Sequence, residues 1–168
     1  TLLLGMKPNE HEFKVMGLAP YGNKNDKEKI AEKIEKNLVS FNSETGDFVS
    51  YSNFKNFRKN LNKIYENEKF EDICAGVQFY LEKMILEWVL FWISKKQILN
   101  VAVSGGVFMN VKATKKISEL EVVKNLFVAP SCGDESLGFG AIFLKQKDNK
   151  IKQELINNLY LGESFSNE

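Results

Sequence analysis

The chain has 168 residues, a length that supports one ordinary domain with its own core. Hydrophobic residues make up 43% of the chain and aromatic residues 12%, which excludes an intrinsically disordered protein. The 23 basic and 22 acidic side chains leave a formal net charge of +1, so charge favours neither nucleic acid nor an anionic membrane as a partner.

Residue types that serve self-contained catalysis are scarce. His11 is the single histidine, and any Ser-His-Asp or multi-histidine zinc site would have to use it. Cys74 and Cys132 are too few for a disulfide scaffold, and no charged-then-apolar signal segment opens the chain, so we expect a cytoplasmic protein. The chain starts at Thr1 without an initiator methionine, and we expect a piece of a longer protein.

The first part of the chain predicts a loop-rich start, a helix and a hairpin. Residues 5–25 are dense in Gly, Pro and Asn and indicate a loop, a short helix and another loop. Asp26 is expected to cap a helix whose inner face repeats every four residues, at Ile30, Ile34 and Leu38. Two short strands around the turn at 43–47 predict a hairpin.

The middle of the chain is helical in pattern. Residues 53–69 have weak helical spacing, at Phe57, Leu61 and Ile64. Residues 71–96 carry a broad apolar face that invites a membrane interpretation, but charged residues interrupt it, so no stretch of about 18 apolar residues exists. A long buried helix is expected there.

The last part repeats strand, loop and helix twice. The first unit is a strand at 98–103, the turn Ser104-Gly105-Gly106 and a helix at 110–120 with Val111, Ile117 and Leu120 pointing inward; the second runs from 126 to 147. This order predicts parallel pairing in an α/β layer, with both polar loops at the carboxyl ends of the strands, where ligands bind.

The glycine turn is the first candidate site. Gly105 and Gly106 would let the backbone approach a ligand closely, the next helix would offer free N–H groups to phosphate or ribose oxygens, and the Asn110 amide could act as both donor and acceptor. A tight turn with Asn110 as a helix cap fits equally well. The turn is neither a Walker loop nor a nucleophile elbow, because no Gly-Lys-Ser/Thr follows and position 102 is Ala102.

The second polar loop, Ser-Cys-Gly-Asp-Glu-Ser at 131–136, is the other candidate. The Asp134 carboxylate at the sheet edge could bind a cation, although a cap on the helix beginning near Glu135 is the simpler interpretation. Cys132 is expected to be a small buried thiol and not a nucleophile, since no histidine lies near it in the sequence.

Three segments in order carry a family resemblance: KPNEHEFKVMGLAPYG, SGGVFMN and LFVAPSCGDESLGFGA. Together, over roughly Gly5 to Ile142, they resemble the nodulation and antibiotic O-carbamoyltransferases, which are related to the threonylcarbamoyl-transfer enzymes that modify tRNA. The resemblance implies one lobe of an actin/hexokinase-type ATPase fold, α/β with a mixed sheet and flanking helices. Residues 1–147 would form the second half of the catalytic domain, and 148–168 a linker toward a further domain.

The resemblance also implies a chemistry. A second domain would make carbamoyladenylate from carbamoyl phosphate and ATP, and the first would transfer the carbamoyl group to a hydroxyl of a small-molecule acceptor. The implied ligand of a divalent, iron-type metal is Asp134. The implied nucleotide contacts are Glu10, Gly22, Gly105, Gly106 and Asn110.

One departure from the family pattern concerns the metal. The other ligands in the family are two closely spaced histidines, and this chain has only His11. The implied partners are therefore a lobe before these residues, which would hold the histidines, and the adenylate-forming domain after them. A sugar-kinase-like nucleotide-binding lobe and a non-catalytic interaction module are the alternatives.

Overall fold

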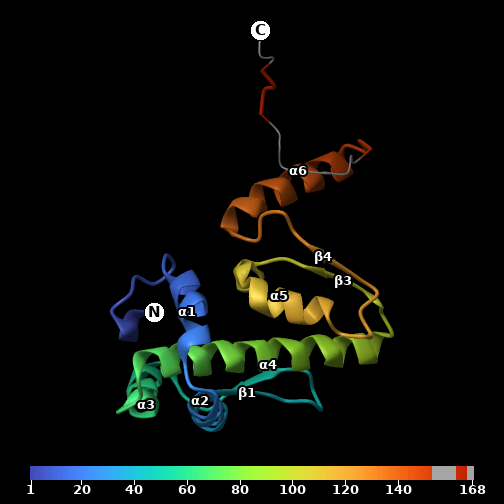
Figure 1. The fold of residues 1–168 in the computed structure, drawn as a ribbon. Coiled ribbons are helices and arrows are strands. Elements are labelled where there is room, and N and C mark those ends of the chain that lie inside the picture. The colour runs from blue at the N-terminus through green and yellow to red at the C-terminus, as the bar shows by residue number, and fades with distance from the viewer. Residues whose placement is uncertain (153–161, 166–168) are drawn as a thin grey trace.

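A computed structural model describes residues 1–152 and 162–165 of the chain, and it is organised around one long helix, α4 (Figure 1). The helices are α1 (Glu12–Leu18), α2 (Lys24–Asn37), α3 (Phe54–Tyr65), α4 (Phe70–Lys96), α5 (Val111–Ser118) and α6 (Leu137–Asp148). The strands are β1 (Val39–Phe41), β2 (Phe48–Ser50), β3 (Asn100–Val103) and β4 (Asn125–Val128).

Helix α4 is buried on two sides, which explains its high apolar content. One core cluster lies between α4 and α2, and a second lies between α4, α5 and the β3–β4 pair. Figure 1 accordingly draws α2 and β1 on one side of α4 and α1 and α5 on the other. Gly76 allows the close crossing of α2, because a Cβ there would lie 2.5 Å from Cβ of Ile30. The expected buried helix is confirmed, and within the described residues no helix combines the length and apolar character that crossing a bilayer requires.

The first part of the fold follows the sequence pattern, with one correction. The hairpin forms as predicted, β1 pairing antiparallel with β2, and the phenol of Tyr80 on α4 donates a hydrogen bond to the Val39 carbonyl. Helix α3 covers the segment of weak spacing. The predicted cap of α2 was wrong: Asn23 is the N-cap and accepts from the Asn25 N–H at 2.9 Å, while Asp26 lies within the first turn.

The predicted parallel pair is confirmed. β3 and β4 run parallel with Val101 opposite Leu126 and Val103 opposite Val128. The loops that follow both strands therefore start at the same end of the sheet. The expected mixed sheet is not formed by the described residues, because the antiparallel and parallel pairs are separate two-stranded sheets. The fold is α/β, and its assignment to an actin/hexokinase-type lobe stays a prediction.

Two helices expose more apolar surface than the sequence predicted. Val111 was expected to point inward but is 63% exposed, because it opens the first turn of α5, whereas Ile117, which was also expected to point inward, is fully buried. Helix α6 has no buried residue, and Figure 1 draws it apart from α4 and α5. The predicted linker, 148–168, lies largely outside the described residues.

Candidate functional site

The glycine turn between β3 and α5 is open to solvent. Gly105 has φ 104° and ψ 153°, a backbone conformation that is essentially confined to glycine. A Cβ at either Gly105 or Gly106 would meet no atom within 4 Å. The turn continues into a short 3₁₀ helix, Gly106–Met109, whose first N–H groups have no intrahelical acceptor. Backbone atoms of this turn are therefore accessible to a ligand.

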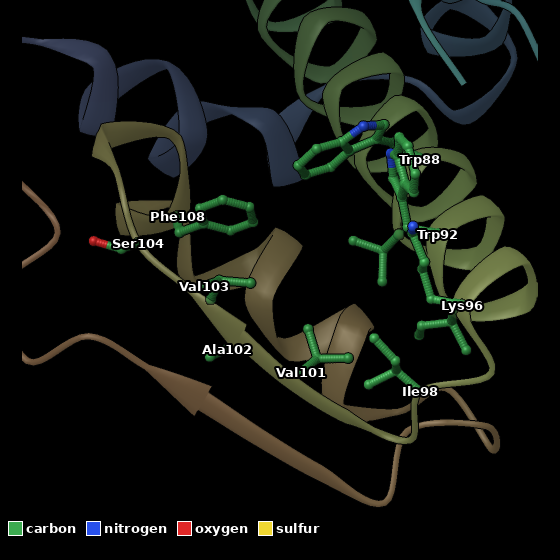
Figure 2. Close-up of a pocket in the computed structure, with 11 residues that line it drawn as sticks. Trp88, Trp92, Lys96, Ile98, Val101, Ala102, Val103, Ser104 and Phe108 are labelled. Carbon is green, nitrogen blue, oxygen red and sulfur yellow. The ribbon is translucent and has the colours of Figure 1, made fainter. Parts of the chain in front are cut away.

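Phe108 anchors the turn to the core. Its N–H donates to the Gly105 carbonyl at 2.9 Å, and its ring is buried with α4 and α5 residues. Figure 2 shows the Phe108 ring on the side of the strand that faces α4, whereas the Ser104 hydroxyl points away from Trp88 and Trp92. The strand end is thus fixed from within while its polar surface faces outward.

Asn110 caps α5 and also binds α4. Its side-chain oxygen accepts from the Ala113 N–H at 3.1 Å, which confirms the cap interpretation. The same oxygen accepts from Nε2 of Gln78 on α4 at 3.0 Å, and Asn110 Nδ2 donates to Gln78 Oε1 at 2.8 Å. The two amides form a closed pair that joins residues 32 positions apart.

A buried polar chain continues from Gln78. Its Nε2 also donates to Glu82 Oε1 at 2.7 Å, and Lys116 of α5 binds the other Glu82 oxygen at 2.8 Å. Gln78 and Glu82 are 5% and 8% exposed, so each polar atom depends on these partners. Sequence reasoning missed Gln78 and Glu82, although two polar residues four apart within the predicted buried helix were a usable signal.

The second polar loop lies at the same sheet end. Asp134 is exposed and is the first residue of the 3₁₀ turn Asp134–Ser136. The N-cap of this turn is Gly133, and the side chain of Asp134 caps no helix. The Ser131 hydroxyl donates to Glu135 and, together with backbone N–H groups of the loop, holds the pKa of that carboxyl below its usual value. Cys132 is buried as expected and donates to the Ala129 carbonyl at 3.3 Å.

The two N-terminal site predictions fall in different settings. Glu10 is exposed in the loop before α1 and forms a surface ion pair with Lys7 at 3.3 Å, a contact of small energetic weight. Gly22 packs on the start of α4, where a Cβ would lie 2.6 Å from the Glu71 carbonyl oxygen. This packing requires a glycine whether or not a ligand lies nearby.

His11 is engaged with its own loop. Its Nδ1 accepts from the Lys7 N–H at 3.2 Å, and its Nε2 lies 3.0 Å from the Lys14 ammonium. Across residues 1–152 and 162–165, no three His, Cys, Asp or Glu side chains are grouped so that they could hold a metal ion. Asp134 therefore belongs to no group of three ligating side chains within the described residues.

A separate apolar pocket of about 410 Å³ lies behind β3. Figure 2 shows Trp88 and Trp92 of α4 lining one side and Val101 and Val103 of β3 the other. Among the described residues that line it, Lys96 is the one that carries a charge. With so few polar groups, this pocket suits apolar contacts and lacks the donors that phosphate recognition needs.

Comparison with known proteins gives consistent matches. A family model described as carbamoyltransferase N-terminus matches residues 1–143, which include both polar loops. An uncharacterised protein of Methanocaldococcus jannaschii is 35% identical over the whole chain, and one of Synechocystis sp. is 26% identical over the whole chain. Nodulation protein NolO of Bradyrhizobium diazoefficiens is 22% identical over 94% of it. The chain spans about a third of these relatives, 32%, 30% and 29% of their lengths.

Proposed function

The chain belongs to the carbamoyltransferase N-terminus family, and on that premise we propose that it forms the nucleotide-binding part of a longer carbamoyltransferase. The donor would be carbamoyladenylate, made from carbamoyl phosphate and ATP, and the acceptor a hydroxyl of a small molecule. The acceptor oxygen would bond to the carbamoyl carbon as the bond from that carbon to the phosphate oxygen breaks, releasing AMP and the hydroxyl proton. The observation that carries the proposal is the family match, which spans both polar loops.

The glycine turn supports the nucleotide role. Its exposed backbone has room for a ligand at Gly105 and Gly106. Two helices begin here, the 3₁₀ helix at Gly106 and α5 at Val111. Free N–H groups and the positive end of a helix favour phosphate oxygens. Asn110 lies at the second of these helix starts, so phosphate or ribose oxygens would meet both backbone and side-chain donors.

The proposal includes Glu10 and Gly22 with separate support. Glu10 is an exposed carboxylate on the segment before α1 and would accept hydrogen bonds from ribose hydroxyls. Helix α1 and the glycine turn share the side of α4 opposite α2, as the blue and yellow segments of Figure 1 show. Gly22 would contribute through the close packing that it allows between the 19–22 turn and α4.

Asp134 would supply one oxygen ligand to an iron-type divalent metal. The described residues alone do not fit a metal centre, because no group of three ligating side chains exists among them. The remaining ligands would have to come from outside these residues, and we therefore assign no step of the reaction to a metal here. In the proposal, the role of Asp134 is limited to supplying one carboxylate ligand from the loop at the same sheet end as the glycine turn.

The test compares the longer protein with these 168 residues alone. We expect the longer protein to consume carbamoyl phosphate and ATP and to carbamoylate hydroxyl acceptors, with product identified by mass spectrometry. The chain alone should transfer no carbamoyl group, because the donor-making domain and further metal ligands lie elsewhere in the proposal. Asp134→Ala and Asn110→Ala should each abolish or strongly reduce turnover in the longer protein.

Three outcomes would contradict parts of this proposal. Turnover by the 168-residue chain alone would refute the need for a longer protein. A phosphorylated acceptor, formed without carbamoyl phosphate, would indicate the sugar-kinase-like alternative. Full activity of both variants would remove these residues from the reaction and favour an interaction module.

A further inference from the structure

We propose that Gln78 is a positioning residue: it holds the Asn110 side-chain amide so that Asn110 can donate a hydrogen bond to the nucleotide but cannot accept one. This inference rests on the proposed function, because it assigns a ligand to the glycine turn. Gln78 lies on α4 and does not belong to the turn, so it would act through Asn110 and not by touching the ligand.

The Asn110 oxygen is already fully used. It accepts from the Ala113 N–H at 3.1 Å and from Gln78 Nε2 at 3.0 Å, and an amide oxygen has two lone pairs. The Nδ2 group has two protons, of which one goes to Gln78 Oε1 at 2.8 Å. Among the residues that the structure describes, no partner takes the other proton. Asn110 can therefore offer a ligand a donor and no acceptor, which narrows the earlier expectation that it could offer both.

The orientation of the pair is determined from both ends. At one end, the Ala113 N–H can only face an oxygen, which sets the Asn110 amide. At the other end, the Glu82 carboxylate faces Gln78 and can only accept, which sets the nitrogen of Gln78. Reversing either amide alone would bring like groups together at distances near 3 Å. The pair thus has one consistent arrangement.

Burial makes this arrangement costly to change. Gln78 is 5% exposed and Glu82 8%, so a reversed amide would leave polar atoms without water as a substitute. Lys116 binds the second Glu82 oxygen at 2.8 Å and connects the chain back to α5, the helix that Asn110 caps. Helices α4 and α5 are therefore held together by the same contacts that orient Asn110.

This arrangement selects the ligand atom opposite Asn110. That atom must accept a hydrogen bond, as a phosphate oxygen, a ribose oxygen or an unprotonated ring nitrogen does. A nucleotide offers several such atoms at the N-terminus of a helix, where they are favoured electrostatically. The buried Gln78 would determine the polarity of the site without contacting the ligand.

The experiment is a double-mutant cycle in the longer protein on the affinity for a non-hydrolysable analogue of carbamoyladenylate, the nucleotide that the proposed function places at the turn, measured by titration calorimetry. The variants are Asn110→Ala, Gln78→Met and both together. Losing one neutral hydrogen bond to the ligand should weaken binding about three- to tenfold in each single variant. In the Asn110→Ala background, Gln78→Met should change affinity by less than about twofold, because its effect passes through Asn110.

Controls separate positioning from folding. Gln146→Met makes the same substitution on α6, which shares no hydrogen bond with this network within the described residues, and should leave affinity unchanged. Circular dichroism and thermal unfolding establish that each variant is folded. If Gln78→Met does not fold, Gln78→Asn replaces it: this variant keeps an amide but is one methylene too short to reach Asn110 and Glu82 together, and it should weaken binding in the same way.

Two results would overturn the inference. If Asn110→Ala weakens binding but folded Gln78 variants bind within about twofold of the parent protein, Gln78 does not position Asn110. The same holds if the two effects multiply in the double variant. If neither Asn110→Ala nor Gly106→Ala changes affinity, the turn is not the nucleotide site, and the proposed nucleotide role and the inference are both wrong.

Discussion

Adding one methyl group to each glycine of the turn separates backbone strain from ligand contact. Gly105 has φ 104° and ψ 153°, where a side chain is strained, whereas Gly106 lacks a positive φ and has room for a Cβ. Gly105→Ala should therefore destabilise the chain by about 1–3 kcal/mol. Gly106→Ala should change stability by no more than about 0.5 kcal/mol.

Thermal unfolding followed by circular dichroism measures the difference. For a chain of this size, a loss of about 2 kcal/mol lowers Tm by roughly 4–8 °C. The two variants add the same methyl group at adjacent positions, so each is the matched control of the other. Equal melting of Gly105→Ala and the parent chain would refute the positive φ as a feature of the folded protein.

For ligand affinity the informative variant is Gly106→Ala, whereas for stability it is Gly105→Ala. If a nucleotide packs on the turn, the methyl group of Gly106→Ala occupies ligand volume, and an overpacking cost of about 1 kcal/mol corresponds to roughly fivefold weaker binding. This loss should occur without a loss of stability. Parent-like affinity for the carbamoyladenylate analogue in a folded Gly106→Ala variant of the longer protein would show that the ligand does not approach this backbone.

Three further changes test the packing around α4. Gly22→Ala should lower the free energy of unfolding by about 1–3 kcal/mol, because the new Cβ would lie 2.6 Å from a carbonyl oxygen of α4. In the control Gly17→Ala the new Cβ meets no atom within 4 Å, so this variant should be neutral or stabilising. Equal Tm values for the two variants would contradict this. Burial raises the pKa of Tyr65 to about 12 and also raises the pKa of Tyr80. The contribution of these phenols to stability is therefore complete below the tyrosine pKa of the unfolded chain, about 10, and is lost as pH rises above that value. Equal free energies of unfolding in urea at about pH 9 and pH 11 would refute this. Tyr80→Phe should cost about 1 kcal/mol at neutral pH, because the Val39 carbonyl loses its donor, and it should reduce the alkaline loss; an unchanged urea midpoint would argue against the bond.

Local patterns in the sequence predicted most of the elements. The four-residue spacing in α2, the long apolar face of α4 and the two strand-loop-helix units all correspond to observed elements. Such patterns are reliable because they reflect contacts between residues a few positions apart. The order of the elements also predicted the parallel pairing of β3 with β4, which places both polar loops at one end of the sheet.

The corrections concern choices that local patterns leave open. Asn23 and Asp26 are both good capping residues, and α2 begins at Asn23, whose own N–H donates to Asp72 of α4 at 2.5 Å. Val111 has the apolar character of an inward residue, but the start of α5 leaves it exposed. In both cases a contact distant in sequence, or its absence, decided the outcome.

The sequence by itself determined the glycine turn, the carboxylate loop and their common sheet end, because residue type and spacing set local backbone geometry. Only the tertiary structure decided what Asn110 can offer a ligand. Gln78 reaches it across 32 positions because α4 and α5 pack together, and that contact occupies the Asn110 oxygen. Hydrogen-bond polarity at the site therefore depends on how two helices cross, which the spacing of residues within either helix does not specify.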